Sequence, residues 1–558
     1  MQRGGTVTPK VAVGGSHTAV LKSDGTVWAT GYNQSGQLGV GDAVASGSSD
    51  SKTATFTQCV DADGQPIQDA TDVACGYSHT AIIRNNGEVW QCGLNQYGQL
   101  GNTSVASGSD SNYSTEFVKS SNITGATQIA CGDSHTAVIV NGEVWQCGRN
   151  NSGQLGNNST ATSTEFVKSS NISGATQIAC GGNHTAVIVN GEVWQCGYNG
   201  KGQLGNNSTT QSPVFVKSSN ISGATQIACG DFHTAVIVNG EVWQCGYNGK
   251  GQLGNNSTTQ SPVFVKSSNI RGATQIACGG NHTAVIVNGE IWQCGYNYYG
   301  QFGNTSVGSG YTSSYSTEFV KSSNITNANE LSTGCKAYHT MALCIENDIY
   351  TLYGAGRNNN GQLGLGDAAG TGNVSTFTKS TTISDIGVYI VPDIEAIAAL
   401  GEGSSRNVTG AGQFVGGYGL QIEWSDLQYT YTATWNKDES KWDGAWEAAE
   451  GNDQIVVKNA SATPCKVEFA FSTNDEFKSP SDGEPGTKGT FADPKVTDEP
   501  ALDTTTNTVP LAVYTTDNQV ANQKTVKLGL DGIPNAKAGT DITEATKVGI
   551  VTVTLKNS

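Results

Sequence analysis

The chain has 558 residues, which is too long for one ordinary hydrophobic core, so we expect at least two domains. Only 14% of the residues are charged, and the abundance of Gly, Ser, Thr and Asn favours short strands joined by turns over helices. A formal net charge of −17 without clustered Lys or Arg argues against a nucleic-acid partner, and no apolar run is long enough to cross a bilayer.

Residues 1–10 contain no apolar core followed by a small-residue cleavage site, so no signal peptide is visible. The composition is nevertheless typical of exported proteins, with 2 Met, few charges and 14 Cys. We therefore expect an extracellular or surface localisation, on a cell or on a virion. Removal of a leader peptide, or release from the cell by another route, would account for an exported protein without a visible signal peptide.

A long phrase recurs over residues 11 to about 384. It reads IACGGNHTAVIVNGEVWQCGYNGKGQLGNNST from Ile178 onward, and from His135 to His282 its histidine returns every 49 residues. This slot holds all 7 histidines of the chain: His17, His79, His135, His184, His233, His282 and His339. Such a period indicates a repeat architecture.

Each repeat predicts four strands. In the fourth repeat these are residues 177–180, 184–189, 192–196 and 214–217. Asn190-Gly191 closes a two-residue hairpin, because both central positions of that turn need positive φ. Seven such units predict a seven-bladed β-propeller over residues 1–384, closed by strand 374–380 lying beside strand 10–14.

Two phrases mark the repeats: Gly-x-x-His-Thr, and Gly-x-Asn-x-x-Gly-Gln-Leu-Gly, in which Phe302 replaces Leu in the sixth repeat. They resemble the regulator of chromosome condensation family, and the resemblance implies a seven-bladed propeller. That family includes a nucleotide-exchange factor, chromatin binders and a secreted inhibitor of β-lactamases, so fold alone does not give the function. The resemblance implies a protein that binds other proteins with its propeller loops.

Residues 385–558 lack the repeat and alternate apolar with polar residues, as in the closing KVGIVTVTLKNS. We predict a β-sandwich here, which resembles modules of bacterial surface proteins. The expected fold class is all-β throughout, with a propeller over 1–384 and a sandwich over 385–558.

The histidine slot argues against catalysis. A residue needed at seven equivalent places serves every blade, so we expect its imidazole to bond a neighbouring turn. Five repeats flank the histidine with two Cys, but the first repeat keeps His17 with Val13 and Thr30 in those slots, which disfavours a metal site. There is no nucleophile elbow and no phosphate-binding glycine loop. We expect no enzyme activity, no cofactor and no metal.

The cysteines leave several arrangements open. The two Cys of one repeat flank an intervening strand, about 9–10 Å apart, whereas a disulfide needs Cα atoms within about 7 Å. Bridges between blades and buried free thiols both stay open. Cys335 and Cys344 form the better candidate pair, since they are expected on adjacent strands of one hairpin.

Loop length suggests where a partner binds. From the last Gly of the second phrase to the strand-four Phe there are 10 residues in repeats three to five, but 17, 16, 16 and 13 in repeats one, two, six and seven. Those four blades are contiguous in a closed ring and give a raised rim. We expect a protein or glycan partner on this rim, contacted by Tyr97, Tyr298, Tyr299, Tyr311 and Tyr338.

The expected function is therefore a non-enzymatic, extracellular or surface-displayed module for protein binding or structure. A virion structural or appendage protein and a secreted enzyme inhibitor are the alternatives.

Overall fold

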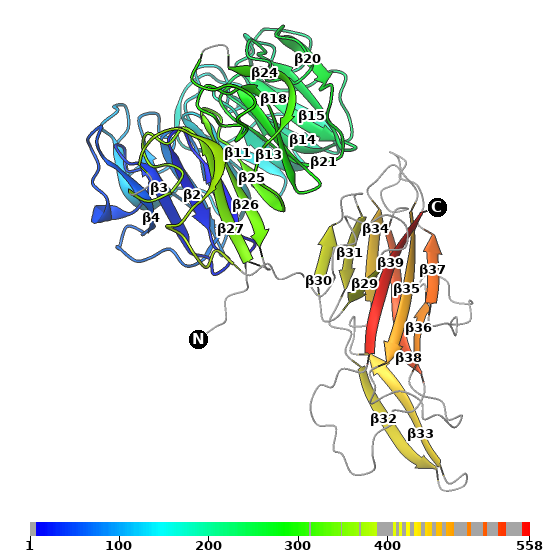
Figure 1. Cartoon of the computed structure of the whole chain (residues 1–558). Helices are drawn as coiled ribbons and strands as arrows, with labels where there is room; N and C mark the ends of the chain where they lie inside the picture. The colour runs from blue at the N-terminus through cyan, green and yellow to red at the C-terminus, as the bar shows by residue number, and fades with distance from the viewer. Residues whose placement is uncertain are drawn as a thin grey trace. The chain divides into compact units, whose positions relative to one another are not determined.

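A computed structural model describes residues 7–387 except 312–313, 347–348 and 368–369, together with the backbone of eleven strands between residues 405 and 557. The chain divides into two compact units, Met1–Tyr389 and Ile390–Ser558 (Figure 1). Of the part that the structure describes, no helix is both long and apolar enough to span a membrane.

The first unit is a propeller of seven four-stranded antiparallel sheets, each made by consecutive strands in the order one to four. Blade one contains β1 (Lys10–Val13), β2 (His17–Leu21), β3 (Val27–Tyr32) and β4 (Lys52–Gln58), and blade two contains β5 (Ala70–Cys75), β6 (His79–Arg84), β7 (Val89–Leu94) and β8 (Tyr113–Lys119). Blade three contains β9 (Ala126–Cys131), β10 (His135–Val140), β11 (Glu143–Gly148) and β12 (Ser163–Lys168), and blade four contains β13 (Ala175–Cys180), β14 (His184–Val189), β15 (Glu192–Gly197) and β16 (Ser212–Lys217). Blade five contains β17 (Ala224–Cys229), β18 (His233–Val238), β19 (Glu241–Gly246) and β20 (Ser261–Lys266). Blade six contains β21 (Ala273–Cys278), β22 (His282–Val287), β23 (Glu290–Tyr296) and β24 (Tyr315–Lys321). Blade seven contains β25 (Ala328–Ser332), β26 (His339–Glu346), β27 (Ile349–Gly356) and β28 (Val374–Lys379). One short 3₁₀ helix, η1 (Gly41–Ala43), lies in the β3–β4 loop.

The hairpin between the second and third strands follows the local sequence. Asn190 and Gly191 have φ values of 50° and 74°, as the two central positions of a tight hairpin require. The same pair of left-handed residues recurs at Asn141-Gly142, Asn239-Gly240 and Asn288-Gly289. The predicted turn and the four-strand repeat are confirmed.

The core lies between neighbouring blades. One cluster joins Ile188 and Val193 of blade four to Ile227, Val236 and Phe264 of blade five. The first strands of successive blades contact one another, which places them toward the centre of the ring. Each blade therefore completes its apolar burial only when the next blade packs on it.

Ring closure differs from the prediction. β28 pairs with β27, and β1 pairs with β2, so residues 374–380 do not lie beside residues 10–14 as a paired strand. Every blade is one continuous segment, so none needs a strand from the other end of the chain. Blade seven instead meets blade one through a shared apolar core and through the bond from Val11 N to Glu330 Oε1 at 3.1 Å.

The second unit is described by its backbone strands. A five-stranded sheet has the order β30 (Gly412–Val415), β31 (Leu420–Trp424), β34 (Gln454–Asn459), β38 (Gln523–Asp531) and β36 (Lys488–Ala492). A four-stranded sheet has the order β29 (Ser405–Val408), β39 (Gly549–Asn557), β35 (Cys465–Thr473) and β37 (Thr506–Pro510), and β32 (Tyr429–Asn436) pairs with β33 (Lys441–Ala448). These strands are antiparallel, and a sandwich over 385–558 stays a prediction.

Candidate functional site

The propeller has two unlike faces. The Gly-x-x-His turns after the first strands and the Gly-x-Asn loops after the third strands emerge on one face, here named the histidine face. The Asn-Gly hairpins and the links between blades emerge on the other, here named the hairpin face. This follows from the antiparallel order of each sheet.

A closed ring of hydrogen bonds supports the histidine face. In each blade the histidine Nε2 bonds the threonine Oγ1 of the next blade. The seven bonds are His17–Thr80 (2.8 Å), His79–Thr136 (3.0 Å), His135–Thr185 (3.0 Å), His184–Thr234 (2.9 Å), His233–Thr283 (3.0 Å), His282–Thr340 (3.1 Å) and His339–Thr18 (3.1 Å). The last bond joins blade seven to blade one and closes the circle.

The threonine fixes the protonation of the imidazole. Thr185 Oγ1 lies 2.9 Å from the Gln146 side-chain oxygen and 2.9 Å from the Gln154 carbonyl oxygen, and both atoms can only accept. Its proton is therefore committed, and His135 must donate from Nε2. Burial lowers the pKa of His135 to about 3, which keeps the ring neutral.

The histidines also pack too tightly for a second role. A Cβ on Gly181 would lie 2.1 Å from His184 Cε1 and 2.6 Å from the Gly230 carbonyl oxygen. The Nδ1 atoms of all seven rings have no hydrogen-bond partner among the described residues. The ring positions the turns of the face and leaves no imidazole open to a substrate.

A charged cluster lies at the axis of the histidine face. Lys336 of blade seven donates to Asp133 Oδ2 of blade three at 2.8 Å, and its Nζ lies 5.3 Å from the ring centre of Tyr77 in blade two. Blades three and seven are not neighbours, so this ion pair crosses the axis. Asp231 Oδ1 is buried without a hydrogen-bond partner in the described chain, and burial, partly offset by Lys336, raises the pKa of Asp231 to about 7.

Four tyrosines of blades six and seven form one cluster beside the axis. Tyr296 stacks on Tyr298 with centroids 6.0 Å apart, Tyr298 meets Tyr299 edge-on at 4.8 Å, and Tyr299 lies 5.3 Å from Tyr338. The Arg357 guanidinium lies 5.5 Å from the Tyr299 ring centre. Together these residues present a continuous aromatic surface with one cation.

The expected contact residues fall into three places. Tyr298, Tyr299 and Tyr338 lie together in this cluster. Tyr311 is 73% exposed in the long loop of blade six. Tyr97 lies apart on blade two, with the Arg149 guanidinium 5.2 Å from its ring centre.

Sequence reasoning missed three members of this face. Tyr296 and Arg357 both occupy the position directly after the third-strand glycine, which varies among Tyr, Leu and Arg along the repeats. That variation could have identified them. Nothing in the repeat marks Lys336, because the seventh turn departs from the Gly-x-x-His phrase.

The cysteines do not form the expected bridge. Cys335 and Cys344 are both buried free thiols, and β26 places Cys344 opposite Ala328, five residues along the strand from His339. Cys335 lies in the turn before His339, so the structure does not bring the pair together. The paired Cys of one repeat, such as Cys180 and Cys196, lie on either side of Thr185 and are also free.

The hairpin face is electrostatically paired. In blades two to seven the last lysine of the fourth strand bonds a glutamate at the start of the third strand, in the hairpin before it or, in blade seven, at the end of the second strand. These pairs are Lys119–Glu88, Lys168–Glu143, Lys217–Glu192, Lys266–Glu241, Lys321–Glu290 and Lys379–Glu346. The repeated pairing cancels the charges of these six lysines.

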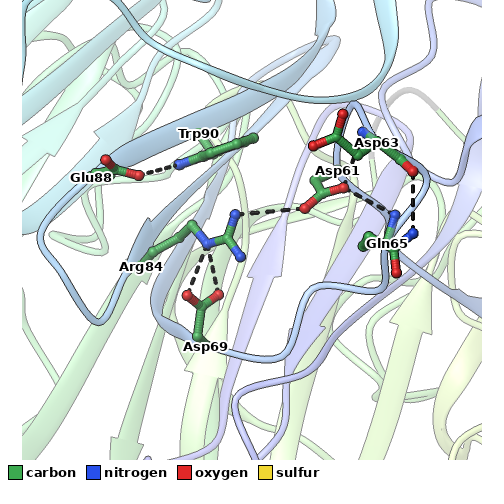
Figure 2. Close-up of polar contacts among 7 residues, drawn as sticks. All are labelled: Asp61, Asp63, Gln65, Asp69, Arg84, Glu88 and Trp90. Atoms are coloured by element: carbon green, nitrogen blue, oxygen red, sulfur yellow. Dashed lines mark hydrogen bonds and ion pairs between the residues drawn. The ribbon is translucent and has the colours of Figure 1, made fainter.

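One inserted link departs from that regular pattern. Figure 2 shows Arg84 between Asp69, which accepts from its Nε at 2.7 and 2.9 Å, and Asp61, 3.7 Å from a terminal nitrogen. The same guanidinium lies 4.7 Å from the ring centre of Trp90. The cluster fixes the longer link between β4 and β5, and its arginine bridges the two carboxylates.

Comparison with known proteins identifies the repeats. The family model described as "Regulator of chromosome condensation (RCC1) repeat" matches residues 24–83, 86–139, 141–188, 190–237 and 239–286. A second model with the same description matches residues 10–37 and 70–99.

Several curated proteins contain similar segments. The X-linked retinitis pigmentosa GTPase regulator homolog of Caenorhabditis elegans is 36% identical over 26% of this chain and 10% of its own length. The probable E3 ubiquitin-protein ligase HERC4 of Rattus norvegicus is 33% identical over 27% of this chain and 13% of its own. The ultraviolet-B receptor UVR8 of Arabidopsis thaliana is 37% identical over 26% of this chain and 30% of its own length. The match thus spans 10–30% of these relatives' own length.

Solved structures show the same fold. Human WBSCR16 aligns over 64% of this chain and 94% of its own with a TM-score of 0.53 at 23% identity. Yeast RCC1 (Prp20), solved bound to Kap60, aligns over 70% of this chain and 86% of its own with a TM-score of 0.54 at 16% identity.

These names correct two expectations. The repeats' relatives are a GTPase regulator homolog, a photoreceptor and ligases, so the expected extracellular or surface-displayed module, with its virion and secreted-inhibitor alternatives, is wrong. The expectation that such a chain has no enzyme activity is also contradicted, because proteins named as E3 ligases carry these repeats. Residues 10–286 are therefore built from regulator of chromosome condensation repeats, and with the blades that follow they form a seven-bladed β-propeller.

Proposed function

We propose that the propeller is the protein-recognition module of a regulatory protein, and that it holds its partner on the histidine face. The distribution of exposed aromatic side chains carries this proposal. Of the described residues, the exposed large hydrophobic side chains are Tyr77, Tyr311, Tyr315 and Ile349, and the three tyrosines belong to the histidine face. Tyrosine provides a large amphipathic contact area at small entropic cost.

The hairpin face is less suited to recognising one partner. Its six Lys–Glu pairs repeat from blade to blade, so equivalent positions present nearly the same surface. The histidine face differs from blade to blade in both side chains and loop length. The partner is expected to cover the tyrosine cluster and the raised rim of blades six, seven, one and two.

The relatives support a regulatory role. Proteins with similar repeats are named as a GTPase regulator homolog and a receptor, and yeast RCC1 was solved bound to another protein. For this chain we also propose that the two larger sheets of the second unit pack face to face as a sandwich. A crystal structure of the full chain with those sheets separated would refute that packing.

Site-specific photo-crosslinking tests the recognition face. A benzophenone amino acid replaces Tyr311, which is 73% exposed on the histidine face, or Ile349, which is 49% exposed on the hairpin face. In extract of the producing cells we expect one partner protein to cross-link at position 311, with unmodified chain competing for it. Equal cross-linking of that protein at position 349 would contradict the proposal. Substituting Tyr298 and Tyr299 by Ala should weaken the cross-link at 311 at least tenfold.

A further inference from the structure

The two faces differ in how their cations are compensated. On the hairpin face of blades three and four, Lys168 and Lys217 each pair with a glutamate. On the histidine face of the same blades, Arg149 and Lys201 make no ion pair with a carboxylate of the described residues. Arg149 donates to Asn151 Oδ1 at 3.1 Å, and both cations lie against tyrosine rings instead.

These contacts join blade two to blade three, blade four to blade five, and blade five to blade six. Arg149 lies 5.2 Å from the ring centre of Tyr97 in blade two, and Lys201 lies 5.7 Å from that of Tyr247 in blade five. Lys250 continues the series, 5.3 Å from the ring centre of Tyr296 in blade six. We name these three cations and three tyrosines the basic arc. It runs from blade two to blade six and ends at the tyrosine cluster.

The sequence keeps carboxylates out of the arc. Residues 149–164, 198–217 and 247–266 contain no Asp or Glu, and Glu165 follows only on the outer strand β12. Aspartates of this face lie instead at the axis and in the long loops of blades one, two and seven: Asp133, Asp231, Asp42, Asp50, Asp110 and Asp367. The arc is thus a local excess of positive charge in a chain whose net charge is −17.

The cations of the arc lie on the blades with short loops. Arg149, Lys201 and Lys250 belong to blades three, four and five, which have the ten-residue spacing, whereas the longer loops belong to the blades at the two ends of the arc. At Arg149 and Lys201 a tyrosine ring restrains the long side chain of the cation, and the N–H groups that point away from the ring can donate to an anion. Tyr97 and Tyr247 therefore hold these two cations in position for an incoming anion.

From this we propose that the basic arc binds an acidic, Asp- and Glu-rich segment of the partner protein; this rests on the proposed function and names the chemistry of the partner. Carboxylates on a flexible segment can meet separate cations one at a time. A polyphosphate backbone is a poorer fit, because its continuous charge would also meet the aspartates at the axis and in the long loops.

Binding of a defined probe tests the proposal on the full chain. The probe is a fluorescein-labelled 12-residue peptide of alternating Asp and Glu, measured by anisotropy at 20 and 150 mM NaCl. Its Asn/Gln counterpart and a 20-base-pair DNA duplex are the comparison ligands. We expect the acidic peptide to bind more tightly than either, with affinity that falls as salt rises.

Two variants of equal charge change give the decisive comparison. R149Q/K201Q should weaken peptide binding at least tenfold, whereas K168Q/K217Q, on the hairpin face of the same blades, should change it less than twofold. Thermal melting checks that both fold. Equal effects of the two variants, no binding of the acidic peptide, or tighter binding of the duplex with the same dependence on Arg149 and Lys201 would each overturn the inference. The photo-crosslinking at positions 311 and 349 does not depend on the binding of the acidic peptide. It therefore tests the proposed recognition face separately from the basic arc.

Discussion

Acidification should unfold the propeller through its histidine ring. Burial lowers the pKa of six of the seven imidazoles to about 3 and that of His79 to about 4, against an ordinary value of 6.5. Since the folded-state pKa values lie below the unfolded-state value, the unfolded chain takes up these protons first as pH falls. The contribution of the ring is therefore complete above pH 6.5 and is lost between about pH 6.5 and pH 3.

The size of the effect follows from the same values. Between pH 7 and pH 5 each buried histidine removes about 2 kcal/mol of stability, or about 13 kcal/mol for seven. Two buried carboxyl groups oppose it, because burial raises the pKa of Asp231 to about 7 and that of Glu330 to about 8. As the pH falls, these two carboxyl groups are protonated first in the folded state. They therefore stabilise the propeller by about 5 kcal/mol between pH 7 and pH 5. The net loss of about 8 kcal/mol is comparable with the whole stability of a domain, about 5–15 kcal/mol.

Hydrogen exchange read by mass spectrometry can follow the propeller separately from the second unit. The peptide that contains β14 should lose protection steeply between pH 7 and pH 5, after correction for the intrinsic exchange rate. H184Q is the matched variant, since an amide can still donate to Thr234 but does not titrate. As the pH falls, the free energy of unfolding of H184Q should decrease less steeply than that of the unsubstituted chain, with a difference in slope of about 1.4 kcal/mol per pH unit. Unchanged protection of β14 down to pH 5 would refute the reasoning.

Three further substitutions test single contacts by urea unfolding. T185V should cost about 2–4 kcal/mol, because it leaves a buried imidazole N–H and a glutamine carbonyl unpaired, whereas T160V at an exposed loop position should cost less than about 0.5 kcal/mol. G181A should cost about 1–3 kcal/mol by forcing a methyl group against an imidazole and a backbone carbonyl, while G372A, with open space around it, should be neutral; equal effects would count against the packing argument. R84A should cost about 1–3 kcal/mol and make the link between β4 and β5 sensitive to protease, and resistance equal to that of the unsubstituted chain would show that the guanidinium does not hold the link.

Local features of this protein follow directly from its sequence. Asn190-Gly191 specifies a hairpin because few other residue pairs adopt positive φ at both positions. The recurrence of one histidine slot then gives the number of blades, since each recurrence repeats the same four-strand pattern. These signals act within one repeat, so they can be interpreted without knowing how repeats pack.

Contacts between distant segments could not be predicted in this way. Ring closure without a shared strand, the separation of Cys335 from Cys344, and the ion pair of Lys336 with Asp133 each depend on where whole blades lie. The tyrosine cluster was predicted only in part, because Tyr296 enters it through its position beside Tyr298 and Tyr338 in space.

The same distinction explains the histidines. The sequence by itself determined that one residue type serves every blade, because a seven-fold repeat leaves no single special site. Only the tertiary structure decided what that service is: the partner of each imidazole is a threonine about fifty to sixty residues further along the chain, or across the ring closure for His339. Packing of neighbouring blades brings the two together, and packing is a property of the closed ring that no single repeat contains.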